Sequence, residues 1–495
     1  MDYAIKIDPK DNVCVALSAV AAGTKLFENA ALVAAEDIPM GHKIALRDIA
    51  SGETVVKYAH TIGRATAPIR AGGHVHSENM ETALSGVLEY TYEPSHAWEH
   101  TPDGNEQTFM GFARPDGSAG VRNEIWVLPT VGCVNGAAEA IAARAQAYVS
   151  GALDGVYAFT HPYGCSQLGE DHARTQDALI GLARHPNTFA VLILGLGCEN
   201  NNIAVFKERL GAYDENRIFF LNSQDCEDEV EAGEEILRTL CARAAREQRV
   251  PCPLSKLTIG LKCGGSDGLS GVTANPLVGR FSDMMVAAGA SVILTEVPEM
   301  FGAETILMQR CVNREVFDKT VDLVNGFKEY FIRHGQEVYE NPSPGNRVGG
   351  ITTLEDKSLG CIRKGGSSAV VDVLRYGQAR SKAGLNLLEA PGNDLVASTA
   401  LAVSGAQIVL FTTGRGTPFG APVPTVKISS NTQLSRKKPR WIDFDAGALT
   451  SGADFEGLAQ KLYTYVLDLA QGDARSWTER ENIRDIAIFK TGVTL

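Results

Sequence analysis

The sequence Trp126-Val127-Leu128-Pro129-Thr130-Val131 runs directly into Gly132-Cys133-Val134-Asn135-Gly136, and an alanine-rich segment, 137–148, follows. The apolar run is typical of a buried strand, the glycines of a tight loop, and the segment after them of a helix. The same order of strand, Gly/Cys loop and helix returns from 156 and again from 190. Repeated βαβ units predict a mostly parallel sheet whose loops gather at the carboxyl edge of the strands.

A second series of this kind begins beyond the polar stretch at 247–253. Its apolar runs lie at 257–261, 291–295 and 407–412. Residues before about 90 carry short alternating segments separated by glycines, which is typical of a turn-rich β domain. We therefore predict an α/β protein with a small N-terminal β domain, 1–93, a linker, 94–107, and two α/β domains with mostly parallel sheets, 108–255 and 256–495.

Composition excludes several classes of protein. Hydrophobic residues make up 44% of the 495 residues and charged residues 21%, which is typical of a globular protein. The net charge of −13 disfavours nucleic acid, and we interpret the one basic run, 436–440, as a solvated turn. No apolar stretch approaches the roughly 20 residues that span a bilayer. Ten cysteines are too sparse for a disulfide scaffold, so we expect a cytoplasmic protein with reduced thiols.

Three cysteines occupy equivalent places. Cys133, Cys165 and Cys198 each follow a glycine at or just after a predicted strand end. Because parallel strands lie roughly 4.8 Å apart, their thiols could converge on one metal ion or on an iron–sulfur cluster. The alternative is that cysteine is simply a small residue suited to a crowded loop.

The N-terminal domain is rich in histidine. His74 and His76 alternate along a predicted strand, which would place both imidazoles on one face, and His42 follows a glycine. Such a group can bind a divalent metal, although histidines near loop ends are at least as often solvated. Four of the ten histidines, at 42, 60, 74 and 76, fall in this smallest domain.

Two loops of the C-terminal domain are suited to binding an anion. Residues 262–268 and 413–418 combine glycine-rich backbone with Lys262 and Arg415, but neither matches a P-loop or a dinucleotide fingerprint. A small carboxylate is therefore favoured over a nucleotide. Residues 341–346 and 349–358 are predicted to form long structured loops, in which Glu355, Asp356 and Lys357 could supply an acid or a base. The alternative is a solvated charge run.

Motifs spread over essentially the whole chain carry a resemblance. They are Gly41-His42-Lys43 and His74-Val75-His76, then 120–124, 132–136, 163–169 and 195–201, then 262–275, 294–302, 341–361, 390–394 and 413–420. On these motifs the chain resembles the altronate/galactarate dehydratase family. The resemblance implies an N-terminal SAF (β-clip) domain and dehydration of D-altronate to 2-dehydro-3-deoxy-D-gluconate in hexuronate breakdown. It also implies Fe2+, or Mn2+, as cofactor. Tyr58-Ala59-His60 departs from the family's Tyr-Gly pattern.

Such a dehydration removes a weakly acidic C2 proton and the 3-hydroxyl, so a metal, a base and an acid are expected. The candidate metal ligands are Cys133, Cys165, Cys198, His42, His74 and His76. The candidate acids and bases are His161, His172 and Lys357, and the candidate substrate-binding residues are Arg122, Asn123, Lys262, Ser266 and Arg415.

Three alternatives remain open at this point. They are a galactarate dehydratase, a sulfolactate-type lyase and a non-catalytic sugar-acid-binding protein. We expect the SAF domain to contribute to the active site, the alternative being an independent module for homo-oligomerisation.

Overall fold

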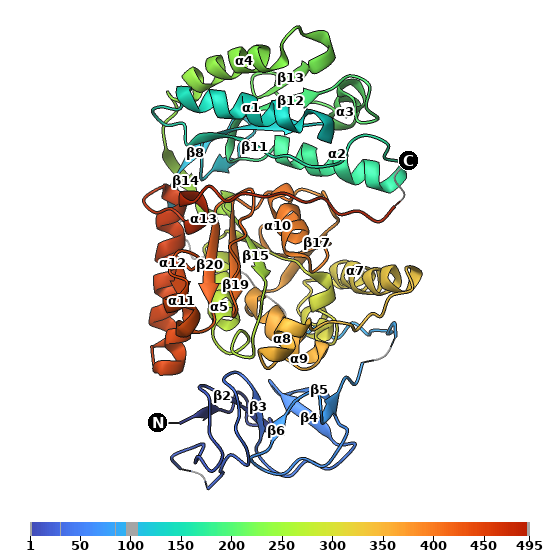
Figure 1. Ribbon diagram of the computed structural model, residues 1–495, viewed down its shortest axis with the longest axis vertical. Coiled ribbons are helices and arrows are strands. Elements are labelled where there is room, and N and C mark those ends of the chain that lie inside the picture. Colours follow the sequence, from blue (N-terminus) through green and yellow to red (C-terminus); the bar gives the residue numbers. More distant parts are fainter. Residues whose placement is uncertain (1, 30, 85, 96–106, 493–495) are drawn as a thin grey trace.

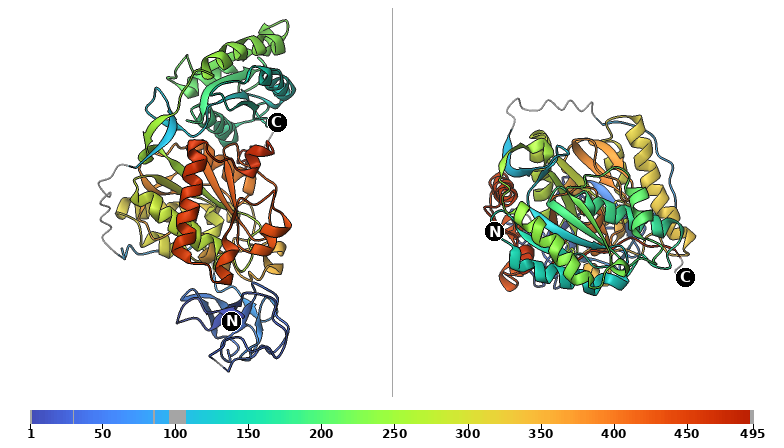
Figure 2. Two further views of the ribbon diagram at one scale, coloured as in Figure 1. Left: turned by 90° about the vertical axis from the view of Figure 1, so that its left-hand side faces the viewer. Right: turned by 90° about the horizontal axis from the view of Figure 1, so that it is seen from above.

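The computed structural model describes residues 2–29, 31–84, 86–95 and 107–492. Three bodies lie in a row, with the C-terminal domain in the middle and the other two domains at opposite ends (Figures 1 and 2). Most of the predicted linker, 96–106, lies outside the described residues. Within the described ranges no helix is both long and apolar enough to span a bilayer.

The N-terminal domain consists of two small antiparallel sheets. One has the order β1 (Ala4–Ile5), β2 (Val13–Ala16), β3 (Lys43–Ala45), β6 (His74–Val75), and the other β4 (Thr54–Lys57), β5 (His60–Ala65), β7 (Met80–Glu81). Tyr58 and Ala59 turn the chain between β4 and β5 with φ of 60° and 64°. This left-handed region favours glycine, so Ala59 occupies a strained position where the family pattern has glycine. The predicted turn-rich β domain is confirmed.

The middle domain has a four-stranded sheet in the order β11 (Gly155–Ala158), β10 (Glu124–Pro129), β12 (Thr188–Gly195), β13 (Ile218–Asn222), and every pair is parallel. Helices α1 (Asn135–Ala145) and α4 (Glu229–Ala244) share a core with one face of the sheet. Helices α2 (Gly169–Ala183) and α3 (Ile203–Leu210) cover the other face. A small antiparallel sheet of β8 (Thr108–Ala113), β9 (Ala119–Gly120) and β14 (Val250–Pro253) lies where the chain enters and leaves.

The C-terminal domain has a seven-stranded parallel sheet. Its order is β17 (Val370–Leu374), β18 (Gly384–Leu388), β16 (Ser291–Leu294), β15 (Thr258–Cys263), β19 (Ile408–Thr413), β20 (Thr425–Ser429), β21 (Phe444–Asp445). Helices α5 (Ala274–Ala287), α6 (Glu304–Met308), α7 (Arg314–Arg333) and α12 (Phe455–Gln471) bury their apolar residues in one core. The sheet's carboxyl edge faces the N-terminal domain (Figure 1).

The two α/β domains share a second core. Helix α10 (Asp394–Val403) packs against α2 of the middle domain, and Trp126, Phe159, Leu401 and Phe411 belong to one buried apolar cluster. Burying this surface stabilises the two domains together. Short helices α11 (Thr432–Lys437) and α13 (Trp477–Arg480) complete the domain.

The prediction of long loops at 341–358 is wrong. The structure has helix α8 (Pro344–Val348) and helix α9 (Leu354–Cys361) there. The hydroxyls of Ser343 and Thr353 cap their amino ends by accepting the backbone N–H of Asn346 and Asp356. All eight residues of α9 are buried despite their polarity. Their burial comes from the domain that covers them, which composition does not reveal.

The N-terminal domain meets the C-terminal domain along a seam of glycines. A Cβ atom on Gly268 would lie 1.8 Å from the carbonyl oxygen of Gly41, and one on Gly350 would lie 2.5 Å from the same atom. Gly41 and Gly350 also have φ of +84° and +97°, which other residues rarely adopt. The glycine seam therefore brings the backbones of the two domains into direct contact.

Candidate active site and metal centre

Two cysteines and a glutamate converge at the carboxyl edge of the large sheet. Cys263 ends β15, Glu299 lies in the turn after β16, and Cys361 ends α9. The two Sγ atoms are 3.4 Å apart, and Glu299 Oε2 lies 3.1 Å from Cys263 Sγ and 3.0 Å from Cys361 Sγ. Within the described part of the chain this is the one group of three potential metal ligands that lie within 4.8 Å of one another. We call it the Cys/Glu centre.

The spacing of the Cys/Glu centre fits a single ion. Ligand atoms about 2.1–2.3 Å from one tetrahedral ion are about 3.5–3.8 Å apart, so a small outward movement of the side chains would admit it. All three side chains are buried. The hydrogen bond with Cys263, together with burial, raises the pKa of Cys361 well above its usual value. A thiol held protonated in this way loses its proton when a metal binds.

Three buried lysines surround the Cys/Glu centre. Lys357 Nζ lies 2.8 Å from Glu299 Oε1, Lys364 Nζ lies 3.1 Å from Glu296 Oε2, and Lys262 is paired with Glu296. Burial opposes the charge of Glu299, but the lysines, Lys357 first, outweigh it and hold the pKa of Glu299 below its usual range. The lysines therefore favour a carboxylate at this centre, whether that of Glu299 or that of a substrate.

The N-terminal domain closes over this edge through a buried ion-pair cluster. Lys43 Nζ lies 2.8 Å and Lys57 Nζ 3.0 Å from the carboxylate of Asp356 on α9. Burial alone would raise the pKa of Asp356, but the two ammonium groups hold it well below its usual range. A small cavity between the domains is lined by residues of both, including Tyr58 and Lys57 from one and Lys357 and Cys361 from the other.

A second, more open cavity of about 370 Å³ adjoins this one. Arg415, Lys437 and Asn431 line it, together with Met40 of the N-terminal domain. Asp267 lines both cavities, which places them side by side. Lys437 belongs to the basic run 436–440, for which the sequence predicts a solvated turn. In the structure Lys437 of this run lines a cavity. Volumes of this size are common for small-molecule sites.

The residues predicted from the sequence fall in three separate places. Lys262, Ser266, Lys357 and Arg415 lie at the Cys/Glu centre or line the two cavities. His42, His74 and His76 lie in the N-terminal domain, whereas Cys133, Cys165, Cys198, Arg122, Asn123, His161 and His172 lie in the middle domain. Because these two domains are at opposite ends of the molecule, one ion shared by the histidines and the three cysteines is excluded (Figure 1).

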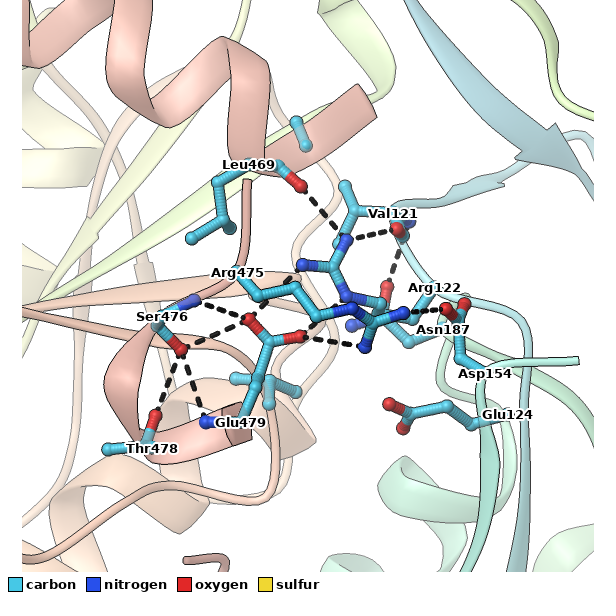
Figure 3. Close-up of polar contacts among 12 residues, drawn as sticks. Val121, Arg122, Glu124, Asp154, Asn187, Leu469, Arg475, Ser476, Thr478 and Glu479 are labelled. Carbon is cyan, nitrogen blue, oxygen red and sulfur yellow. Dashed lines mark hydrogen bonds and ion pairs between the residues drawn. The ribbon is translucent and has the colours of Figure 1, made fainter. Parts of the chain in front are cut away.

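Arg122 has a structural role rather than the predicted one in substrate binding. Its guanidinium is fully buried, pairs with Glu479 at 2.6 Å, and donates to the carbonyl oxygens of Val121 and Leu469 (Figure 3). Asn123 is likewise buried and donates to the carbonyls of Ala152 and Ala244. These contacts hold the middle domain together and join it to the C-terminal segment, so both side chains are engaged in structural hydrogen bonds.

His161 is also hydrogen-bonded to the backbone through both ring nitrogens. Its Nε2 lies 2.8 Å from the carbonyl oxygen of Pro129, and its Nδ1 accepts the N–H of Tyr163. Burial lowers the pKa of His161 to about 4, so the ring is neutral with both nitrogens in use. It is not available as the predicted acid or base. His172 lies on α2 in the same domain, away from the Cys/Glu centre.

The three N-terminal histidines form a stacked cluster at the domain boundary. Their ring centroids are 5.0–5.2 Å apart, and His42 Nδ1 lies 2.9 Å from His74 Nε2. His42 Nε2 and His76 Nε2 lie 3.1 Å and 2.8 Å from the carbonyl oxygens of Val348 and Arg347 in α8. These histidines therefore contact the C-terminal domain directly.

This cluster predicts a loss of stability in mild acid. Burial, with the nearby His74, His76 and Lys43, lowers the pKa of His42 to about 4, while an unfolded histidine titrates at about 6.5. The unfolded chain thus binds more protons between these values, so stability falls as the pH drops from about 6.5 to 4. In thermal melts across that range, His42→Gln is expected to flatten the slope. The exposed His334 at the end of α7 is the control, and an unchanged slope in His42→Gln would contradict the assignment.

Sequence reasoning missed Cys263, Glu299 and Cys361 as a group. Cys263 also stands at the end of a predicted strand, but it precedes glycines, whereas Cys133 follows one. Glu299 stands after the next strand, as Glu296-Val297-Pro298-Glu299. The sequence offered no comparable signal for Cys361, which reaches the site only because α9 folds back beneath the N-terminal domain.

A buried thiol and carboxylate centre among lysines, closed by a second domain, is an arrangement for chemistry on a small anion, and this defines an enzyme. The chain belongs to the altronate/galactarate dehydratase family. Residues 2–83 match the altronate/galactarate dehydratase SAF domain, 111–245 the D-galactarate dehydratase/altronate hydrolase second domain, and 254–494 the D-galactarate/altronate dehydratase C-terminal domain.

Relatives of full length support this assignment. The chain is 52% identical to altronate dehydratases of Bacillus subtilis (strain 168) and Escherichia coli (strain K12). The alignments cover 99% of both chains in the first case and 100% of both in the second. It is 31% identical to the galactarate dehydratase (L-threo-forming) of Escherichia coli (strain K12), over 98% of this chain and 96% of that one.

Proposed function

We propose that this enzyme dehydrates D-altronate to 2-dehydro-3-deoxy-D-gluconate and water, in the breakdown of hexuronates. The observation that carries the proposal is the Cys/Glu centre, set among lysines beside a cavity lined by Arg415 and Lys437. The two full-length altronate dehydratases at 52% identity support altronate over galactarate, whose dehydratase is 31% identical.

We further propose that Cys263, Glu299 and Cys361 hold one Fe2+. Two thiolates and one carboxylate suit iron better than the harder Mn2+, which also binds divalent-metal sites more weakly. When bound, the ion would polarise the substrate's carboxylate and stabilise the negative charge that develops beside it. Arg415 and Lys437 line the open cavity and would hold the anionic end of a substrate there.

The leaving hydroxyl needs a proton donor, and Lys357 suits that role. Burial would lower the pKa of Lys357, but its ion pair with Glu299 outweighs burial and raises it, so the amine stays charged. It is also hydrogen-bonded to the side-chain oxygens of Asn341 and Asn346, which fix its position. A charged, positioned ammonium can give a proton to a departing hydroxyl.

The C2 proton needs an acceptor, and Lys427 suits that role. Burial lowers the pKa of Lys427 to about 7, and its amine donates a hydrogen bond to the carbonyl oxygen of Thr417 at 2.9 Å. In the sheet, Lys262, Phe411 and Lys427 are paired in one row across β15, β19 and β20. An amine that is partly neutral near pH 7 can accept a proton at the operating pH.

The test is a panel of hexonates and hexarates assayed with Fe2+ and a reductant, scored for formation of 2-keto-3-deoxy acid. We expect D-altronate to be turned over with the highest kcat/KM, and exhaustive chelation to abolish turnover until Fe2+ is restored. Faster turnover of galactarate would replace the substrate assignment. Full activity in protein shown by elemental analysis to be free of metal would contradict the metal requirement.

A further inference from the structure

The exposed cysteines of this chain gather in one place. Of the ten free cysteines, Cys133, Cys165 and Cys198 are exposed, and all three lie at the carboxyl edge of the middle domain's sheet. Cys226 is half-buried and the other six are buried. Free cysteine is among the most buried residue types. Three exposed thiols at one sheet edge are therefore unusual, and they indicate a ligand-binding site.

The three loops that carry these thiols are hydrogen-bonded to one another. They follow β10, β11 and β12, which are neighbours in the order β11, β10, β12. The N–H of Gly132 donates to the carbonyl of Tyr163 at 2.8 Å, and the N–H of Asn201 to the carbonyl of Gly164 at 3.1 Å. The N–H of Ser166 donates to Asn200 Oδ1 at 2.8 Å. Each cysteine is within three residues of such a bond, so the three loops that carry the thiols are held together.

Positive charge from two sources lies near this surface, alongside the carboxylates of Glu170, Asp171 and Glu199. Helices α1, α2 and α3 all begin within five residues of one of the three cysteines, and their amino ends carry partial positive charge. Lys490 of the C-terminal segment adds an ammonium group 4.6 Å from the ring centroid of Tyr163. Both positive charges attract an anionic ligand, such as an iron–sulfur cluster with its thiolates.

The placement does not suit one ion. Among the described residues, the three thiols are not part of any group whose ligand atoms all lie within 4.8 Å, whereas ligands of one tetrahedral ion are about 3.5–3.8 Å apart. Ligands of a multi-iron cluster are spread more widely because each binds a different iron. Gln224 Nε2 also donates to Cys198 Sγ at 3.6 Å, and hydrogen bonds to sulfur are a feature of iron–sulfur sites.

We propose that Cys133, Cys165 and Cys198 bind a [4Fe–4S] cluster through three thiolates, with the fourth iron facing solvent. The site is separate from the Cys/Glu centre, which lies in the other α/β domain. Binding is a ligand exchange in which three thiolates of this chain replace three on a donor cluster. The thiol protons pass to the released ligands, and no iron changes oxidation state.

Cys226 supplies a matched control. It follows β13 at the same edge of the sheet, but its Sγ donates back to the carbonyl of Asn222 at 3.3 Å, so it is directed at its own strand. Serine in its place would keep that hydrogen bond. Cys226→Ser should therefore leave cluster binding unchanged.

The experiment is anaerobic transfer of a synthetic [4Fe–4S] cluster with 2-mercaptoethanol ligands to the full chain, followed by desalting. We expect four iron and four sulfide ions per chain, a broad visible absorbance, and an electron paramagnetic resonance signal after reduction with dithionite. Cys133→Ser, Cys165→Ser and Cys198→Ser, each checked for folding by circular dichroism, should bind roughly tenfold less sulfide or less still.

Absence of bound sulfide in the wild-type chain would overturn the proposal, as would equal binding by the three serine variants. Loss of the cluster in Cys226→Ser would overturn its three-thiolate form. Cys361→Ser separates this proposal from the proposed function, because it should lose the single Fe2+ and altronate turnover while it keeps the sulfide.

Discussion

Glu299→Gln is expected to lower kcat for altronate by about 1,000-fold and to abolish stoichiometric metal binding. Glu299 is the one carboxylate of the Cys/Glu centre, with one oxygen against both thiols and the other 2.8 Å from Lys357. An amide is a poor metal ligand and carries no charge, so the variant loses a ligand and releases the lysine from its partner. Steady-state kinetics and elemental analysis of the desalted protein measure the two effects.

Glu304→Gln is the matched control for this variant. Glu304 is also buried and paired with a lysine, Lys328, at 2.9 Å, but it belongs to α6 and not to the Cys/Glu centre. Its loss should lower the melting temperature without removing the metal. Normal iron content and turnover in folded Glu299→Gln would show that the Cys/Glu centre is not the catalytic metal site.

Asp356→Ala is expected to destabilise the chain by about 3–5 kcal/mol and to abolish activity. The substitution leaves Lys43 and Lys57 buried without their shared carboxylate, and an unpaired buried charge is costly. The domain that closes over the active site would then no longer be held there. Equilibrium unfolding in urea, followed together with turnover, measures both consequences.

A triple variant distinguishes the charge effect from simple loss of contacts. Replacing Lys43, Lys57 and Asp356 by Met, Met and Leu removes all three charges and keeps similar volumes, so much of the stability should return. If Asp356→Ala alone melts like the wild type, the ion-pair cluster is not what fastens the N-terminal domain.

The sequence predicts the architecture well because the signals for parallel sheets are local. Each buried strand is a short apolar run, and each is closed by glycine, as at Gly132 and Gly264. The cap signals of α8 and α9 were also present, since Ser343 and Thr353 each precede a helix by one residue. The polar composition of these segments nevertheless favoured a loop prediction over a helix prediction.

The candidate site could be predicted only in part. Lys262 and Lys357 stand in motifs that marked them, but Cys263 and Cys361 are 98 positions apart and meet only through tertiary folding. Arg122 shows the opposite error. Its partner Glu479 is 357 positions away, so nothing near Arg122 in the sequence reveals that its charge is already satisfied.

The glycine seam between Gly41, Gly268 and Gly350 limits which substitutions the two domains can accept during evolution. A side chain on Gly268 or Gly350 would collide with the backbone of Gly41, and a Cβ on Gly41 would lie 3.2 Å from the carbonyl oxygen of Gly349. A β-clip domain taken from another protein would seat here only if it kept the same bare turn. Substitutions on the two sides of this contact therefore depend on one another. The N-terminal domain is not an interchangeable module.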